Sequence, residues 1–366
     1  MTKFFITALF ICCFGFYGTA QTKIFEGGRT ENKRLEAFLK AKMDSIGMPG
    51  LSIAVIRKGK IVFHKALGVA NLQSGKKIND EAIFEAASLS KTAFAYFVMK
   101  QVDKGLLDLD KPLYKYMEYD DIAYDSRYKL ITARMVLSHT AGFPNWRTTD
   151  FPDSSLNVKR GQLYLKFTPG TQFSYSGEGY YYLSQVIAVI NKVDMKQLDS
   201  IFQREVAQPL GLQRCWFSYN DFIGLNKVTG YRNKKPILRW PGSLATQDST
   251  KFGAAGGLHT EAVSYATLLI ALMESKGFKN TTTDELFRSQ IKLPLDEDHD
   301  GDTGWGLGVA VMEGPEKISY EHRGNNGNFQ SYFWMDRKAG NGYVFFTNSD
   351  LAGELHEHLK NYLRLN

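Results

Sequence analysis

The sequence predicts an α+β fold in which both ends of the chain build one sheet domain and the middle is helical. Runs rich in Val, Phe and Tyr with strand character occur near both ends. Helical patterns separated by long polar and aromatic loops fill about residues 106–255. Residues 21–85 and 254–366 are therefore expected to form the sheet domain, with residues 86–253 as an inserted helical region.

The first part of the sheet domain is predicted from a helix and two strands. Apolar residues at helical spacing indicate an amphipathic helix over residues 32–46, which Met48-Pro49-Gly50 ends. The almost wholly apolar run Leu51–Ile56 predicts a central strand, and the mixed run Lys60–Ala66 predicts a strand nearer an edge. Arg57-Lys58-Gly59 between them is typical of a hairpin turn.

The later elements follow from the same periodicities. The inserted region is expected to contain helices over Ile131–His139, Tyr180–Asn191 and Asp194–Ala207, the last ended by Gln208-Pro209. The stretches Asn145–Ser155 and Trp216–Ser249 show no sustained period and are expected to be loops that set specificity. After Gly256-Gly257 we expect, in order, the helix Thr260–Met273, the strands Gly306–Met312, Lys317–His322, Phe329–Trp334 and Gly342–Thr347, and a closing helix marked by Leu351, Leu355, Leu359 and Leu363.

The first 20 residues are typical of a secretory signal peptide. Lys3 gives a basic start, residues 4–16 are apolar, and Gly18-Thr19-Ala20 offers the small residues of a cleavage site. A membrane anchor is the alternative, but the apolar run is short for a span. Lipidation of Cys12 or Cys13 also stays open. The expectation is an exported protein, periplasmic or extracellular, with no membrane span after cleavage.

The composition of the chain argues against nucleic acid as a partner, against an internal disulfide and against a later membrane span. The net charge of +7 is spread along the chain without a block of Lys and Arg, so nucleic acid is not an expected partner. Removal of residues 1–20 leaves Cys215 as the single cysteine, so no internal disulfide is expected and the core alone must stabilise the fold. The most apolar later stretch, Ala262–Met273, is too short to cross a membrane and predicts a buried helix.

The best candidate nucleophile lies at the start of an apolar helix. Ser88 begins a pattern that is rich in helix formers and reaches to near Gly105. Lys91 follows three residues later and so lies on the same helix face as Ser88. A neutral lysine beside a hydroxyl at a helix N-terminus makes an activated nucleophile. The alternative is that Ser88 simply caps the helix.

Two further motifs supply the other groups that acyl transfer needs. Tyr175 sits in a Gly- and Ser-rich loop, where its phenol can relay a proton to a leaving group if a nearby cation lowers its pKa. A packed loop tyrosine is the alternative. In His322-Arg323-Gly324-Asn325, the glycine lets a substrate lie along a strand edge and accept from a backbone N–H. Asn326-Gly327 also fits an ordinary hairpin turn.

His139 is expected to be a buried, hydrogen-bonded histidine. A Ser-His-Asp triad of His139 with Ser88 is not supported, because the chain contains no Gly-x-Ser-x-Gly elbow, the motif that presents the serine in many such triads.

The order of these motifs resembles the penicillin-recognising serine hydrolases, in the branch of class C β-lactamases, D-Ala-D-Ala carboxypeptidases, D-aminopeptidases and related esterases. The resemblance runs from about residue 33 to the C-terminus and implies a β-lactamase/transpeptidase-like fold, with an antiparallel sheet flanked by N- and C-terminal helices. The motifs that carry it are Ser88-Leu89-Ser90-Lys91, Leu137–Gly142, Pro169–Ser176, Gly256-Gly257-Leu258 and His322-Arg323-Gly324.

The resemblance implies a role for each motif. Ser88 would be acylated, and Lys91 and Tyr175 would share the general base and acid work, with the first base left open because coupled groups titrate together. The backbone N–H groups of Ser88 and Asn325 would form the oxyanion hole. His322, in place of the family's lysine, would bind substrate together with Arg323, Gly324 and Gly177.

Two departures from the family pattern bear on the substrate. Many members carry Asn at the position of Gly177, and His322 is charged only part of the time near neutral pH. Both departures favour an esterase or peptidase-like hydrolase that acts on a small-molecule or peptide-like substrate. The alternatives are a class C-type β-lactamase and a penicillin-binding or sensor protein that does not hydrolyse. The sequence does not predict the oligomeric state.

No cofactor or metal is expected. The acidic run Asp296–Asp302 matches only the first half of a calcium loop, because Leu307 stands where the bidentate Glu is needed. His356 and His358 are two apart and do not share a helix face, which argues against zinc.

Overall fold

The computed structural model describes residues 25–152, 156, 158–237, 252–294, 299 and 301–363. The predicted signal peptide, residues 238–249 of the predicted loop Trp216–Ser249 and most of the acidic run Asp296–Asp302 lie outside these residues. Within the described residues, no helix is both long and apolar enough to cross a membrane.

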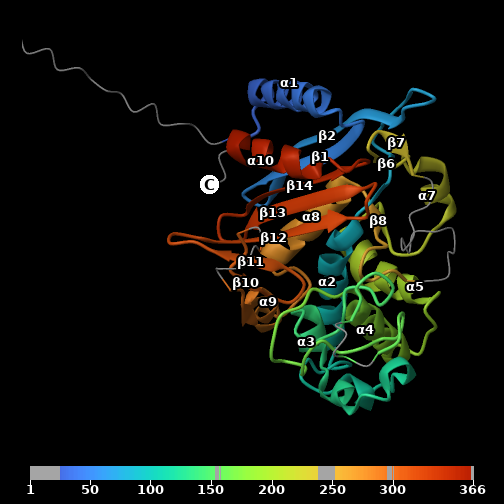
Figure 1. The fold of residues 1–366 in the computed structure, drawn as a ribbon. Helices are drawn as coiled ribbons and strands as arrows, with labels where there is room; N and C mark the ends of the chain where they lie inside the picture. Colours follow the sequence, from blue (N-terminus) through green and yellow to red (C-terminus); the bar gives the residue numbers. More distant parts are fainter. Residues whose placement is uncertain are drawn as a thin grey trace, which may run out of the picture.

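A large antiparallel sheet forms the upper half of the molecule in Figure 1. Its order is β3-β2-β1-β14-β13-β12-β11-β10-β9, so strands from the two ends of the chain meet where β1 pairs with β14. The prediction of an α+β fold with an antiparallel sheet is confirmed. The nine strands among the described residues are β1 (Gly50–Arg57), β2 (Lys60–Asn71), β3 (Lys76–Lys77), β9 (Ile291–Lys292), β10 (Gly304–Trp305), β11 (Ala310–Glu313), β12 (Ile318–Asn325), β13 (Gln330–Asp336) and β14 (Asn341–Thr347).

Each face of the sheet has its own hydrophobic core. On one face, helices α1 (Arg29–Ile46) and α10 (Ala352–Leu363) pack against strand residues that include Leu51, Ile53 and Val55. The intervening residues Ala54 and Ile56 face a larger core, which also contains α8 (Ala262–Met273) and α2 (Ser90–Asp103). β1 is buried along its whole length because both faces are covered, as its apolar run predicts.

The larger core continues from the sheet into the helical middle of the chain, which Figure 1 shows below the sheet. Two small sheets accompany the large one: β4-β8-β5, which pairs a strand of the middle region with strands outside it, and the hairpin β6-β7. Their strands are β4 (Phe84–Glu85), β5 (Cys215–Trp216), β6 (Tyr231–Arg232), β7 (Lys235–Pro236) and β8 (His259–Thr260). The remaining helices are α3 (Ala133–Leu137), α4 (Gly177–Ile190), α5 (Leu198–Phe202), α6 (Gln208–Leu210), α7 (Asp221–Asn226) and α9 (Asn280–Phe287).

The helix predicted over residues 194–207 is wrong at both ends. Asp194 accepts hydrogen bonds from the N–H groups of Lys196 and Gln197 through its side chain, which forms a turn, and the helix begins only at Leu198. At the other end a π-helical turn over Gln203–Ala207 leads into α6, so the helix continues past Pro209. The stretch from Trp216 is also less irregular than expected, since it contains α7 and the β6-β7 hairpin.

The strand predicted over Gly306–Met312 is broken. The chain leaves the sheet after β10 and returns at β11, and Gly308 between them adopts a left-handed φ of 82°. Its N–H donates to the Leu137 carbonyl (2.9 Å) and its carbonyl accepts from the Thr92 hydroxyl (2.7 Å). These bonds to the helical region replace bonds within the sheet and bring the turn against α2.

Candidate active site

Ser88 lies in a single 3₁₀ turn, Ala87–Leu89, between β4 and α2. The α-helix begins at Ser90 rather than at Ser88, so the predicted start was two residues early. Ala87 adopts a left-handed φ of 46°, a conformation that costs an alanine about 1 kcal/mol and must be held by its surroundings. The turn places Ser88 just before the helix, where backbone N–H groups have no partner within the helix.

The surroundings of this turn explain how the strain is held. The Ser90 hydroxyl donates to the Ala87 carbonyl (2.5 Å) and accepts from the Leu258 N–H (2.9 Å). From β13, the Ser331 hydroxyl donates to the Ala86 carbonyl (2.7 Å). Gly324 on β12 is required here, because a Cβ at this position would lie 2.1 Å from Ser331 Oγ and 3.1 Å from Ala87 Cβ. Strands β12 and β13 and the Ser88 turn are therefore in direct contact.

Lys91 is buried beside Ser88, in the first turn of α2. Its Nζ lies 3.4 Å from Ser88 Oγ and donates to the Ala255 carbonyl at 2.7 Å. The same Nζ is 4.7 Å from the centroid of the Tyr175 ring. Burial lowers the pKa of this amine to about 7, because the charged form loses its hydration. A substantial neutral fraction at neutral pH gives Lys91 the protonation state that a general base requires.

Tyr175 contacts both of these groups, and its pKa is raised rather than lowered. Burial raises the pKa of the phenol, and a hydrogen bond with the Ser88 side chain opposes this rise only in part. The sequence made proton relay by Tyr175 conditional on a pKa lowered by a nearby cation, and this condition is not met, because Lys91 gives up its own charge readily in the same buried site. Tyr175 thus remains a protonated phenol at neutral pH and is suited to donating a proton.

Ser88 and Tyr175 line a cleft of about 370 Å³. It brings together five of the eight predicted site residues, whereas Lys91, Gly177 and Gly324 are not among those that line it. Of its apolar wall, the sequence had suggested only Trp305 as a pocket residue; it missed Leu293 and Ala310, and it read Asp302 as part of a solvated acidic loop, since isolated residues of these kinds carry no motif. The lining residues are Ser88, Asn145, Phe173, Tyr175, Leu293, His299, Asp302, Trp305, Ala310, His322, Arg323 and Asn325.

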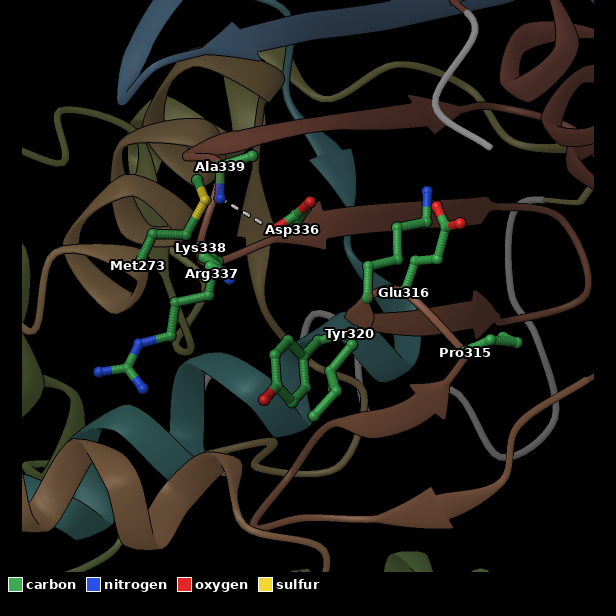
Figure 2. Close-up of a pocket in the computed structure, with 11 residues that line it drawn as sticks. Met273, Pro315, Glu316, Tyr320, Asp336, Arg337, Lys338 and Ala339 are labelled. Atoms are coloured by element: carbon green, nitrogen blue, oxygen red, sulfur yellow. Dashed lines mark hydrogen bonds between the residues drawn. The ribbon is translucent and has the colours of Figure 1, made fainter.

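A larger hollow of about 870 Å³ lies elsewhere, by the turns that join β11 to β12 and β13 to β14. Figure 2 shows Tyr320, Asp336 and Arg337 along it. Its lining contains no serine, cysteine or histidine, so it offers no nucleophile paired with a base. The smaller cleft at Ser88 is therefore the candidate active site.

His322 is neutral in this cleft. It is buried, and burial together with the nearby Lys91 lowers its pKa to about 3. Its Nδ1 lies 2.8 Å from the Arg323 carbonyl, which assigns the proton to Nδ1 and leaves Nε2 as an acceptor. The expectation of a partial positive charge near neutral pH is wrong, since a buried imidazole cannot keep the hydration that its charged form needs.

Arg323 supplies the positive charge at the cleft instead. Its guanidinium pairs with Glu321 (2.5 Å) and with Asp302 (3.4 Å), and about a third of the side chain remains exposed. Two carboxylates therefore already share this cation. It offers a substrate carboxylate less attraction than an unpaired lysine would.

The two predicted oxyanion donors both line the cleft. Ser88 comes from the strained turn, and Asn325 ends β12, opposite Gln330 of β13. The Asn325 side chain accepts from the Gly327 N–H (2.7 Å), which fixes the turn after the strand. Their role as an oxyanion hole stays a prediction.

Gly177 does not reach the cleft. It is the first residue of α4, and its N–H donates to the carbonyl (3.0 Å) and to Oδ1 (3.1 Å) of Asn145. A Cβ at Gly177 would lie 2.5 Å from the Trp146 ring. The indole fills the place where a side chain at this position would go, so substrate contact at Gly177 finds no support in the geometry.

His139 is buried, as predicted. Its Nδ1 accepts from the Ser176 N–H (3.0 Å), and its ring lies 4.3 Å from that of Tyr175, centroid to centroid. Burial, together with Lys91 and His322, holds its pKa well below the usual value, so the ring is neutral. It positions the Tyr175 loop.

The fold and the cleft together define the class of β-lactamase-related serine hydrolases. The family described as "Beta-lactamase" matches residues 35–365, and the chain belongs to this family.

Known proteins of several kinds are similar to the chain. Esterase EstB of Burkholderia gladioli is 24% identical over 365 residues, which cover 87% of this chain and 91% of that protein. Protein flp of Staphylococcus aureus (strain NCTC 8325 / PS 47) is 21% identical over 57% of this chain, which matches only 43% of that protein's length. The octameric penicillin-binding protein homologue of Pyrococcus abyssi has a TM-score of 0.70 and 23% identity, over 87% of this chain and 73% of that one. A second solved structure, titled "Crystal structure of SurE", aligns with a TM-score of 0.72 and 22% identity. The alignment covers 92% of this chain and 76% of that one. At these identities the solved structures show the fold alone.

Proposed function

We propose that this protein is an exported serine hydrolase that cleaves carboxylic esters through an acyl-enzyme on Ser88. The observation that carries the proposal is the buried Lys91 amine, which lies 3.4 Å from Ser88 Oγ and has a pKa of about 7. The pairing of a hydroxyl with an amine that loses its charge near neutral pH is the arrangement that activates a serine.

The chemistry assigns one task to each group. Neutral Lys91 takes the Ser88 proton as Oγ attacks the ester carbonyl, and the N–H groups of Ser88 and Asn325 stabilise the negative oxygen. Tyr175, a protonated phenol, donates to the departing alkoxide and is reprotonated from Lys91. Water then attacks the acyl-enzyme, with Lys91 again as the base, and releases the acid. Of the two candidates for the first base, the opposite pKa shifts favour Lys91.

Three features favour an ester over a β-lactam. His322 is neutral, no side chain projects from Gly177, and the charge of Arg323 is shared with two carboxylates. These features weaken the recognition of a substrate carboxylate and amide. The name of the relative that matches most of this chain, an esterase, points the same way. A class C-type β-lactamase is the second candidate, since Arg323 does place a partly exposed cation at the cleft.

A comparison of two substrates with one variant tests the proposal. Wild-type protein should hydrolyse p-nitrophenyl butyrate, with nitrocefin turned over far more slowly. Ser88→Ala should lose ester turnover by roughly a thousandfold or more. Ser174→Ala, which changes the residue directly before Tyr175 and one that does not line the cleft, serves as the control. Faster turnover of nitrocefin than of the ester would favour the β-lactamase, and full activity of Ser88→Ala would remove Ser88 from the chemistry.

Export is a separate part of the proposal and rests on the N-terminal sequence pattern. N-terminal sequencing of the protein secreted by an expressing bacterium should give Gln21 as the first residue. An intact Met1 terminus in the cytoplasmic fraction would contradict it.

A further inference from the structure

Glu85 is a buried carboxylate that the chemistry proposed for the cleft does not use. It ends β4, three residues before Ser88, and only 4% of it is exposed. A carboxylate in such a place needs partners, because burial removes the water that would otherwise stabilise its charge. Each of its two oxygens has a partner from a different part of the chain.

One oxygen of Glu85 pairs with a lysine. Lys227 Nζ lies 2.6 Å from Glu85 Oε1. Backbone pairing beside β4 places the lysine there, because the Ile83 N–H donates to the Asn226 carbonyl (3.0 Å) and the Val228 N–H donates to the Ile83 carbonyl (3.0 Å). The lysine balances the buried charge, and the second oxygen can accept from another group.

The second oxygen holds the turn that follows β12. Asn326 Nδ2 donates to Glu85 Oε2 (2.7 Å) and to the Gly256 carbonyl (3.3 Å). The Asn326 N–H donates to the Phe329 carbonyl (2.9 Å) in the hairpin turn that the Asn-Gly pair predicts. Asn326 therefore has a task besides the turn, since its side chain ties the end of β12 to the strand that leads to Ser88.

This contact lies between the two backbone groups that are predicted to form the oxyanion hole. Glu85 precedes Ser88 by three residues, and Asn326 directly follows Asn325. Two oxyanion donors act together only if both lie within hydrogen-bond distance of the same oxygen. A displacement of about 1 Å can cost a factor of about a hundred in rate. The separation of the two donors therefore depends on the contact between Glu85 and Asn326.

We propose that Glu85 and Asn326 are positioning residues that set the separation between the backbone donors of Ser88 and Asn325. The proposal rests on the proposed function, because the two donors stabilise the negative oxygen formed during ester cleavage. Glu85 and Asn326 are not among the residues that line the cleft, so they act through the backbone and do not touch substrate. Loss of their contact should weaken the stabilisation of the transition state and leave substrate binding nearly intact.

Asn326→Asp breaks this contact with little change in shape. Aspartate also suits a turn before glycine, but it places a second carboxylate against Glu85. We expect kcat for p-nitrophenyl butyrate to fall by about 10–100-fold, with KM changed by less than about threefold. Inhibition by phenylboronic acid, whose adduct on Ser88 places an oxygen at the same donors, should weaken by a similar factor. Should this variant not fold, Asn326→Ala removes the donor without adding charge and carries the same expectation.

A double variant and a control make the test specific. Glu85→Gln combined with Asn326→Asp exchanges the amide and the carboxylate, so the glutamine amide can donate to the aspartate and its oxygen can accept from Lys227. It should bring kcat back to within about fivefold of wild type. Asn79→Asp makes the same chemical change at an exposed turn, where Oδ1 already accepts from the Glu81 N–H (3.2 Å), and should behave like wild type.

The outcomes separate the two proposals. Wild-type kcat in Asn326→Asp, or a raised KM with kcat kept, overturns the positioning role while the hydrolase stands. A fall in kcat with unchanged boronate inhibition, or with no recovery in the double variant, likewise overturns it, because Asn326 would then only support the turn. If wild-type protein hydrolyses no ester, the proposed function fails, and the positioning role fails with it.

Discussion

At the scale of single residues, burial determines the chemistry more than charge does. Lys91, Tyr175 and His322 share one buried site, and burial shifts the pKa of each toward its neutral form. The neutral form of Lys91 can accept a proton and that of Tyr175 can donate one. Neutral His322 offers no positive charge to a substrate. The sequence identified these residues but not their protonation states, because a pKa depends on neighbours that the fold brings together.

The pH profile of ester hydrolysis reports the Lys91 pKa. Because burial lowers this pKa to about 7, the neutral base accumulates as pH rises through 7. We expect kcat/KM to rise between pH 6 and 8, with a midpoint near 7, and then to level off. Stopped-flow hydrolysis of p-nitrophenyl butyrate measures this.

Lys91→Arg provides the control for that profile. Its guanidinium stays charged at these pH values, so the rate should fall by about 10²–10⁴-fold and lose the inflection. A wild-type profile that is flat from pH 6 to 9 would contradict the assignment of Lys91 as the base.

Tyr175→Phe should have an effect that depends on the leaving group. The variant lacks the phenol proton, which an alkoxide needs in order to depart, whereas p-nitrophenolate leaves without protonation. We expect a loss of about a hundredfold for ethyl butyrate and a much smaller loss for p-nitrophenyl butyrate. Equal losses for the two esters would mean that Tyr175 positions Ser88 and does not act as the acid.

At the scale of elements, the site depends on close approaches that local sequence patterns do not reveal. The sequence predicts most helices and strands, because their apolar residues repeat with a period of 3.6 or 2. It misses the break at Gly308 and the π-helical turn before Pro209, where contacts with other elements override the local pattern. The reason for a glycine at position 177 is likewise visible only in the structure, where the Trp146 ring fills the space that a side chain would need.

Gly308→Ala tests the contact between the broken strand and α2. The substitution introduces a Cβ 2.5 Å from Ala95 Cβ and 3.3 Å from the Lys91 carbonyl, at a left-handed φ. We expect the free energy of unfolding to fall by about 2–4 kcal/mol, from backbone strain and overpacking together. Urea denaturation measures this change.

Gly75→Ala is the matched control for that experiment. It has a similar left-handed φ of 69°, but no atom lies within 4 Å of the added Cβ. It should therefore cost only about 1 kcal/mol, from the backbone alone. Equal losses of unfolding free energy in the two variants would show that Gly308 does not pack closely against Ala95 of α2.

At the scale of the whole molecule, the two ends of the chain meet in one sheet and the helical middle shares its larger core. That core includes Val344 and Phe346 of β14 together with Phe143 and Leu198 of the middle region. Strand patterns at both ends were enough to predict that the two ends contribute to one sheet. The strand order and the shared core could not be predicted, since they depend on pairings between residues almost 300 positions apart, such as Leu51 with Thr347.

A shared core predicts cooperative unfolding. If the sheet and the helical middle are held by one continuous core, neither can open without exposing apolar surface of the other. We expect urea transitions followed by far-ultraviolet circular dichroism and by tryptophan fluorescence to coincide. Two separated transitions would show that the helical middle unfolds independently of the sheet.

The most direct test of the central claim is the mass of the protein after incubation with a fluorophosphonate, followed by peptide mapping. Wild-type protein should gain one adduct, on the peptide that contains Ser88, and labelling should quicken as pH rises through 7 because Lys91 becomes neutral. Ser88→Ala should gain none, and Ser174→Ala should be labelled like wild type. An adduct on another residue, or equal labelling of Ser88→Ala, would contradict the assignment of Ser88 as the nucleophile.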